Sequence, residues 1–83
     1  MRFLEEVKAL LTDTLYLGER GAELQVDSHL LGSLPELDSM AVISLVAAIE
    51  EHFGIQMEDD DISADTFATV GSLAEYIDRK KGA

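Results

Sequence analysis

Apolar residues recur at steps of three and four along three stretches of the chain, which is the spacing of one face of an α-helix. The stretches cover residues 3–15, 38–52 and 69–82. Gly18 follows the first stretch and Gly54 follows the second, and glycine is common just past the end of a helix. The pattern therefore predicts three main helices with these approximate bounds.

The middle stretch has the widest apolar face of the three. Its central stripe consists of Val42, Leu45, Val46, Ile49 and Phe53, and the residues that widen it are Met40, Ile43 and Ala47. A helix with so broad an apolar face is expected to contact more than one neighbour.

Between the first two predicted helices, residues 18–38 lose the helical period. Five apolar residues remain in this connection: Leu24, Val26, Leu30, Leu31 and Leu34. We expect the connection to pack onto the core, and a loop of this length in a small domain is usually functional. Further along, Ile62 beside the acidic run 58–61 predicts a short helical turn, and no alternating run is long enough to predict a strand.

These elements predict an all-α fold: a small four-helix bundle, made of three main helices plus one short helix, with a long first loop. The 83 residues correspond to a single domain spanning 1–83. A domain of this size buries only about 60–65% of the surface that its unfolded chain exposes. It therefore has one modest core and little room for a deep active-site cleft.

Charge and composition narrow the functional classes. Six basic and seventeen acidic residues give a net charge of −11. This charge repels the phosphate backbone of nucleic acids, so the sequence argues against a nucleic-acid-binding protein. The acidity either attracts basic partners or simply keeps the protein soluble. The chain has no cysteine, no membrane span and no signal peptide at its N-terminus, so we expect a monomer in the cytoplasm.

The acidic run was compared with a calcium-binding loop that would start at Asp59. The sixth position of such a loop needs glycine and the twelfth needs a bidentate glutamate, but the chain has Ala64 and Val70 there. We interpret the run as a solvated acidic turn. The chain's two histidines lack clustered partners, so no metal site is predicted.

Serine hydrolysis is the second chemistry to test, with Ser39 as the nucleophile. Its surroundings are not a G-x-S-x-G elbow, and His52 would lie roughly 20 Å away along the same helix. His29 in the preceding loop could approach, but no oxyanion-hole signature accompanies it. We predict that the protein is not an enzyme and that both histidines are ordinary surface or half-buried residues.

Asp38 and Ser39 open the second predicted helix. Both are favoured N-cap residues because their side-chain oxygens accept from unpaired N–H groups of the first turn. A phosphate on Ser39 would face those N–H groups and the positive end of the helix dipole. The pair permits a phosphodiester-linked group, although the spacing alone fits an ordinary helix cap at least as well.

Two blocks of the sequence, residues 37–55 with Leu45 and Val46 at their centre and residues 69–77, resemble the acyl carrier protein family. Residues 37–40, Leu-Asp-Ser-Met, are similar to the family's Asp-Ser-Leu or Asp-Ser-Met triplet at the start of its second helix, and residues 49–55, Ile-Glu-Glu-His-Phe-Gly-Ile, are similar to the pattern that closes that helix. Residues 69–77 resemble the family's last helix, which often begins Thr-Val. The likeness covers nearly the whole chain, although the first helix is only generically similar.

The resemblance implies a four-helix carrier that is not an enzyme. Ser39 would receive 4′-phosphopantetheine from coenzyme A through a phosphopantetheinyl transferase, and Asp38 would place Ser39 and contribute to the magnesium environment of the transferase complex. The thiol of the arm would hold acyl groups as thioesters, in a chain without cysteine. Further partners implied are acyl-AMP ligases, acyltransferases or synthases with basic docking patches. The residues expected to meet partners are Glu36, Leu37, Met40, Ile43, Glu50 and Glu51.

Three positions depart from the family pattern. Glu36 stands where the family most often has glycine, and Ala41 and Ser44 stand where carriers of fatty-acid synthesis are commonly acidic. With the unusual loop 32–37, these departures predict a dedicated carrier of a specialised pathway, similar to carriers found beside acyl-AMP ligases in exopolysaccharide or exosortase-associated gene groups. The cargo stays open, as do two alternatives: a peptidyl or aminoacyl carrier, and an unmodified acidic helical adaptor.

Overall fold

The computed structural model describes residues 3–30, 32, 34 and 37–82. Its elements are α1 (Leu4–Leu15), α2 (Glu19–Ala22), α3 (Ser39–Phe53), the 3₁₀ helix η1 (Asp59–Asp61) and α4 (Val70–Gly82). The predicted all-α fold with three main helices is confirmed, and the part of the chain described here forms no strand. The short turn predicted beside Ile62 is η1, whereas α2 was not predicted.

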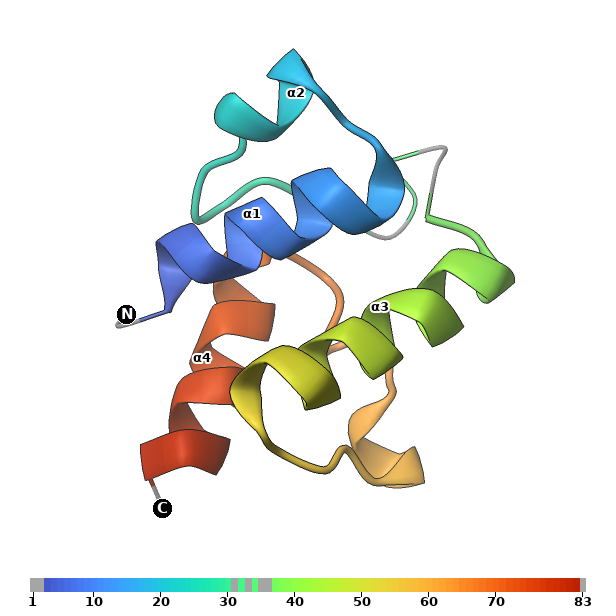
Figure 1. Ribbon diagram of the computed structural model, residues 1–83, viewed down its shortest axis with the longest axis vertical. Coiled ribbons are helices and arrows are strands. Elements are labelled where there is room, and N and C mark those ends of the chain that lie inside the picture. Colours follow the sequence, from blue (N-terminus) through green and yellow to red (C-terminus); the bar gives the residue numbers. More distant parts are fainter. Residues whose placement is uncertain (1–2, 31, 33, 35–36, 83) are drawn as a thin grey trace.

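Helix α1 lies between α2 on one side and α3 and α4 on the other (Figure 1). Its apolar face therefore meets the other long helices, as its sequence pattern requires. The buried side chains form one cluster: Val7, Leu11, Leu15, Leu17, Leu24, Leu30, Leu37, Leu45, Ile49, Phe53, Met57, Phe67, Val70, Leu73, Ala74, Tyr76 and Ile77. A single core of this kind is what a domain of this length can build.

The backbone of the first loop is tied to Ala68, just before α4, and to the first turn of α4. The Leu30 N–H donates to the carbonyl oxygen of Ala68 over 2.9 Å, and the Gly71 N–H donates to that of Val26 over 2.8 Å. These bonds satisfy backbone groups that would otherwise be left unpaired next to the core. The described stretch 26–30 of the loop is therefore held against the core, as the prediction that the loop packs down requires.

The apolar side chains of this loop divide between the core and solvent. Leu24 and Leu30 are buried, and Leu34 packs against the core. Val26 is 43% exposed, so the prediction that it packs down is wrong for its side chain. Leu31 lies outside the described residues.

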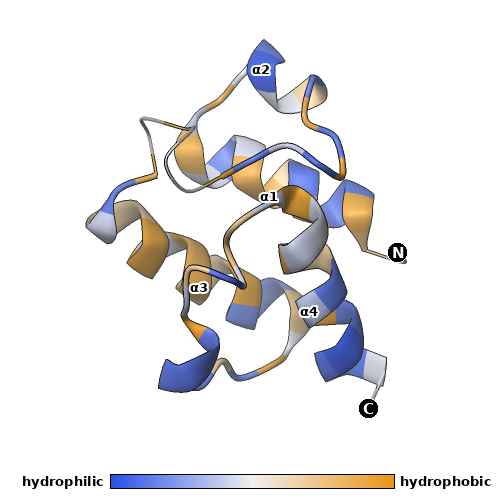
Figure 2. Cartoon of the chain, turned by 180° about the vertical axis from the view of Figure 1, so that it is seen from behind, coloured by the Kyte–Doolittle hydropathy of each residue, from blue (hydrophilic) through white to orange (hydrophobic). Residues whose placement is uncertain are grey.

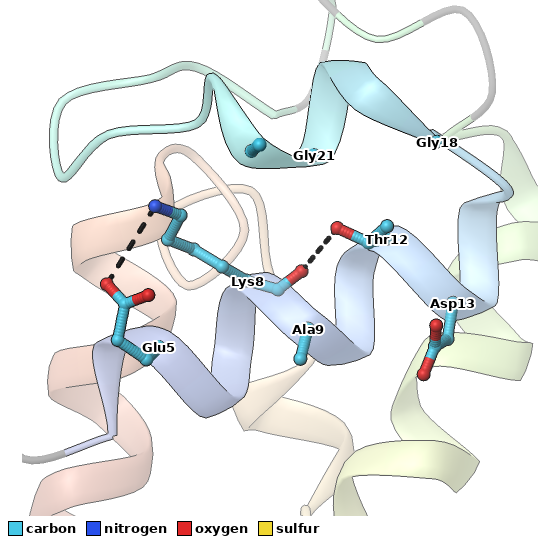
Figure 3. Close-up of a pocket in the computed structure, with 8 residues that line it drawn as sticks. Glu5, Lys8, Ala9, Thr12, Asp13, Gly18 and Gly21 are labelled. Atoms are coloured by element: carbon cyan, nitrogen blue, oxygen red, sulfur yellow. Dashed lines mark hydrogen bonds and ion pairs between the residues drawn. The ribbon is translucent and has the colours of Figure 1, made fainter.

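Helix α2 rests on α1 through a glycine. A Cβ on Gly21 would overlap the side chain of Thr12 and come within 2.8 Å of its Cβ. The two helices thus approach closely where residue 21 has no side chain, beside an open groove lined by Gly18 and Asp13 (Figure 3). Four residues are too few to show a helical period, which is why the sequence pattern missed α2.

The wide apolar face of α3 is only partly buried. Leu45, Ile49 and Phe53 lie in the core, but Met40 is 71% exposed and Ile43 is 63% exposed. Ala47 is exposed as well, so the broad face does not bring a second neighbour onto the residues that widen it. Figure 2 shows hydrophobic residues along most of α3, whereas η1 and the end of α4 are hydrophilic.

Side-chain hydrogen bonds cap the start of α4 and the end of α3. Thr69 and Ser72 bond reciprocally, each backbone N–H donating to the other's hydroxyl over 3.0 Å, which confirms the cap predicted at Thr69. The Lys81 ammonium donates to the carbonyl oxygen of Phe53 over 2.9 Å. This bond satisfies a carbonyl of the last turn of α3 and places a positive charge at the negative end of its dipole.

Candidate functional site

Asp38 is the N-cap of α3. Its backbone is extended, with φ −103° and ψ −173°, and its Oδ1 accepts from the Ala41 N–H over 2.8 Å. Its carbonyl oxygen accepts the first bond of the helix, from Val42, over 2.9 Å. Both bonds fix the direction in which the chain enters α3, so the next residue has a defined position.

Ser39 is the first residue of α3, and its side chain is exposed. Its hydroxyl forms no hydrogen bond with the residues that the structure describes. The carboxylate of Asp38 satisfies the N–H of Ala41, which leaves other N–H groups of the first turn to face a group attached at Ser39. The arrangement presents a hydroxyl to solvent at a fixed point, in a field that favours an attached phosphate.

Comparison with known proteins shows the family of the chain that carries this serine. A family model described as "Phosphopantetheine attachment site" matches residues 5–77. The chain belongs to this family. It is also similar to the holo acyl carrier protein of Nitrosomonas europaea, solved in solution by NMR, with 49% sequence identity, a TM-score of 0.94 and full coverage of both chains.

The geometry of this phosphopantetheine-attachment domain suits its cofactor. The cofactor is joined through a phosphodiester, which needs an accessible hydroxyl and tolerates no buried surroundings that exclude a charged phosphate. Ser39 is exposed and stands at a helix N-terminus, where backbone N–H groups and the dipole favour an anion. The residues present therefore fit the group.

Two residues expected to meet partner enzymes lie on the surface beside Ser39. Met40 and Ile43 are three residues apart, on one face of α3, and both are largely exposed. Leu37 is 7% exposed and belongs to the core, so it anchors the loop before α3 instead of offering a contact. Glu36 falls outside the described residues.

The two glutamates at the end of α3 have different surroundings. Glu50 is half-buried, and its Oε2 accepts from the Met57 N–H over 2.8 Å. This bond holds the segment after α3 against the helix. Glu51 is exposed, so of the two only Glu51 has a side chain directed freely to solvent.

Among the described residues, neither histidine forms a hydrogen bond with the candidate nucleophile. His29 forms an isolated bridge with Thr69. His52 sits in the last turn of α3, its Nε2 3.7 Å from a carboxylate oxygen of Glu6 and its ring edge-on to Phe53. His52 and Ser39 lie at opposite ends of α3. The imidazole of His52 is therefore too far from the Ser39 hydroxyl to act as its base.

The described residues contain neither a cluster of metal-ligating side chains nor a helix that could span a membrane. No group of three or more histidine and carboxylate side chains in the described ranges could hold a metal ion. No helix among these residues is long and apolar enough to cross a membrane. The acidic run is not entirely solvated, because Asp61 is half-buried and bonded to Tyr76.

Proposed function

We propose that Ser39 is the attachment residue for 4′-phosphopantetheine and that the chain, as one domain, works as an acyl carrier protein. The family match and the full-length likeness to a holo acyl carrier protein support the function. The observation that supports the residue is the exposed Ser39 hydroxyl on the first turn of α3, held in place by the Asp38 cap.

The chain and the cofactor have separate tasks. The arm supplies a terminal thiol that takes an acyl group as a thioester, which this chain without cysteine cannot supply itself. Asp38 fixes the start of α3, and the helix N-terminus favours the phosphate on Ser39. The small domain holds the arm out to its partners, and no group on it is assigned a catalytic step.

We propose that the partners are a phosphopantetheinyl transferase and the enzymes that load and use the acyl group, with Met40 and Ile43 as apolar contacts. The acidic surface favours partners with basic docking patches. Ser44 is exposed and uncharged beside these residues, which supports recognition by apolar contact more than by charge along this part of α3. We place such a carrier in a specialised pathway, acting as a monomer in the cytoplasm.

Intact-mass measurement tests the attachment. The purified protein is incubated with coenzyme A, magnesium and a broad-specificity phosphopantetheinyl transferase, and the modified peptide is then mapped. We expect the mass of one phosphopantetheine to be gained on the peptide that contains Ser39. Ser39→Ala should gain nothing, whereas Ser44→Ala, which removes another exposed serine of α3, should be modified like the wild type.

The outcomes separate the candidate functions. Modification of Ser39→Ala would reject the assigned residue, and an unmodified but folded wild-type protein would favour the adaptor. Once the arm is attached, loading by an acyl-activating ligase supports the acyl carrier. Loading only by an amino-acid-adenylating enzyme would identify an aminoacyl carrier instead.

A further inference from the structure

Tyr16, the residue that follows α1, combines two unusual properties. Its backbone is left-handed, with φ 57° and ψ 46°, and it is the only residue other than glycine with positive φ in the described part of the chain. Its side chain is 89% exposed. The left-handed region is unfavourable for residues with a Cβ, so a bulky aromatic side chain here needs an explanation.

The fold explains why the backbone turns at residue 16, but it does not explain why the residue there is a tyrosine. The turn directs Leu17 into the core, where it is 4% exposed, and lets the Leu17 N–H donate to the carbonyl oxygen of Thr12 over 3.0 Å. Glycine would make this helix end without strain. Because the ring of Tyr16 lies in solvent, it contributes little to packing within the domain.

Contacts between α1 and α3 place Tyr16 near the attachment end. The helices run in opposite directions (Figure 1). Glu6 on α1 lies beside His52 on α3. Four residues further along α1, Leu10 lies beside Ala48, which is four residues earlier on α3. Continuing this register by six residues brings Tyr16 level with position 42. That position is three residues from Ser39, or about 4.5 Å along the helix axis.

The side of α3 that faces Tyr16 leads to the exposed apolar residues. Ala41 lies seven residues before Ala48 and therefore on the same side of α3, toward α1. Ser44 follows Ala41 by three residues, and both side chains are small. The register and these small side chains therefore place the exposed ring at the same end of the domain as Met40 and Ser39.

The charges near this surface indicate what kind of partner fits it. Asp13 and Glu19 flank Tyr16 along the chain, and Asp38 precedes the serine; all three are exposed. Arg20 is basic, but it already has an interaction within the protein. An enzyme that binds the polyanion coenzyme A needs basic side chains around its active site, so it complements these carboxylates.

We propose that Tyr16 is a docking contact for the phosphopantetheinyl transferase that modifies Ser39. The ring meets the basic rim of that enzyme, where an arginine or lysine lies over its exposed face. On this proposal, the tyrosine ring serves binding to the transferase, at a position where the backbone conformation alone would favour glycine. This inference rests on the proposed attachment at Ser39.

Steady-state kinetics of the transferase of the same organism, with coenzyme A and varied apo-protein, test the proposal. For Tyr16→Gly we expect the KM for the carrier to rise at least about fivefold, with kcat nearly unchanged. The same variant should melt a few degrees higher, about 2–6 °C, because the left-handed strain is relieved. Tyr16→Asn, which tolerates this backbone, should raise KM likewise, and Tyr16→Phe should keep the wild-type KM because it keeps the ring.

Val26→Ser is the matched control, since Val26 is another exposed apolar residue and its loop is bonded to the start of α4. An unchanged KM for Tyr16→Gly, or an equal rise for Val26→Ser, would overturn the docking contact while leaving attachment at Ser39 intact. A wild-type protein that is never modified would overturn the proposed function, and the docking contact with it. A raised KM confined to the variants that lack the ring supports the proposal.

Discussion

The phenol hydroxyl of Tyr76 donates to Oδ2 of Asp61 over 2.8 Å, joining α4 to η1. The same oxygen accepts from the Glu58 N–H over 3.2 Å and lies 3.7 Å from the Lys80 ammonium. The hydrogen bond from Tyr76, followed by the bond from Glu58, holds the pKa of Asp61 below its ordinary value. Burial, followed by the bond to Asp61, raises the pKa of Tyr76.

The lowered pKa of Asp61 predicts a loss of stability in acid. The carboxylate stabilises the fold above its unfolded pKa of about 3.9, and this contribution is lost as the pH falls below that value through the lower folded pKa. Tyr76→Phe removes the largest cause of the shift, so its urea midpoint should fall less steeply below about pH 4. Tyr16→Phe, which removes an exposed phenol hydroxyl, is the control; equal slopes for the two variants would contradict the prediction.

The raised pKa of Tyr76 predicts a separate loss of stability in base. The fold favours the neutral phenol, so its contribution is complete below the unfolded pKa of about 10 and declines as the pH rises above it. Thermal melts between about pH 8 and pH 11 should show this decline in the wild type and a smaller one in Tyr76→Phe. If the two proteins decline in parallel, Tyr76 is not the group responsible.

Gly21→Ala should weaken the packing of α2 on α1. The new Cβ would overlap Thr12, so one helix must shift, at a cost of about 1–3 kcal/mol in the free energy of unfolding. Ala22→Ser, at the neighbouring exposed position, should change that free energy by less than about 0.5 kcal/mol. Urea unfolding followed by circular dichroism measures both, and an unaltered midpoint for Gly21→Ala would show that α2 does not need the close approach.

Alanine variants of Glu50 and Glu51 should distinguish a structural role from a role in docking. Glu50→Ala leaves the Met57 N–H without its partner and should reduce the free energy of unfolding by about 1–2 kcal/mol. Glu51→Ala removes an exposed carboxylate and should stay within about 0.5 kcal/mol of the wild type. A stable Glu50→Ala protein with weakened partner binding would instead assign Glu50 to docking, as the sequence had suggested.

Asp38→Ala should affect both the fold and the modification of Ser39. Losing the cap to Ala41 should reduce the free energy of unfolding by about 1 kcal/mol and loosen the first turn of α3. Asp38→Asn keeps an acceptor oxygen at the cap and should recover most of this stability. Chemical unfolding and the rate of transfer from coenzyme A are measured on both variants; a rate that Asp38→Asn does not restore would indicate that the carboxylate charge itself is needed.

The three main helices and two of their caps were predictable because they depend on neighbours in the sequence. Their apolar spacing repeats within a few residues, and the oxygens of Asp38 and Thr69 reach N–H groups only three residues away. Such contacts form within a single helical turn. The place of Ser39 at a helix start was predictable for the same reason, whereas its proposed role as an attachment residue came from the resemblance to a known family.

Tertiary structure decided which apolar residues are buried. The sequence gives Leu37, Met40 and Ile43 the same apolar character, but the fold buries the first and exposes the other two. Burial depends on the direction in which the loop enters α3 and on which side α1 packs. The spacing of apolar residues in α3 specifies neither of these. The extent of the exposed apolar surface beside Ser39 could therefore be determined only from the tertiary structure.

By itself, the sequence determined the helices, the acidic surface and the serine at a helix start, because these follow from composition and from contacts within a turn. Only the tertiary structure determined α2, which needs the close approach of Gly21 to Thr12, and the bond between Tyr76 and Asp61, which joins residues fifteen positions apart. It also turned the side chain of Tyr16 into solvent. Each of these depends on how the helices lie against one another, and that arrangement is set by the packing of the common core rather than by any local pattern.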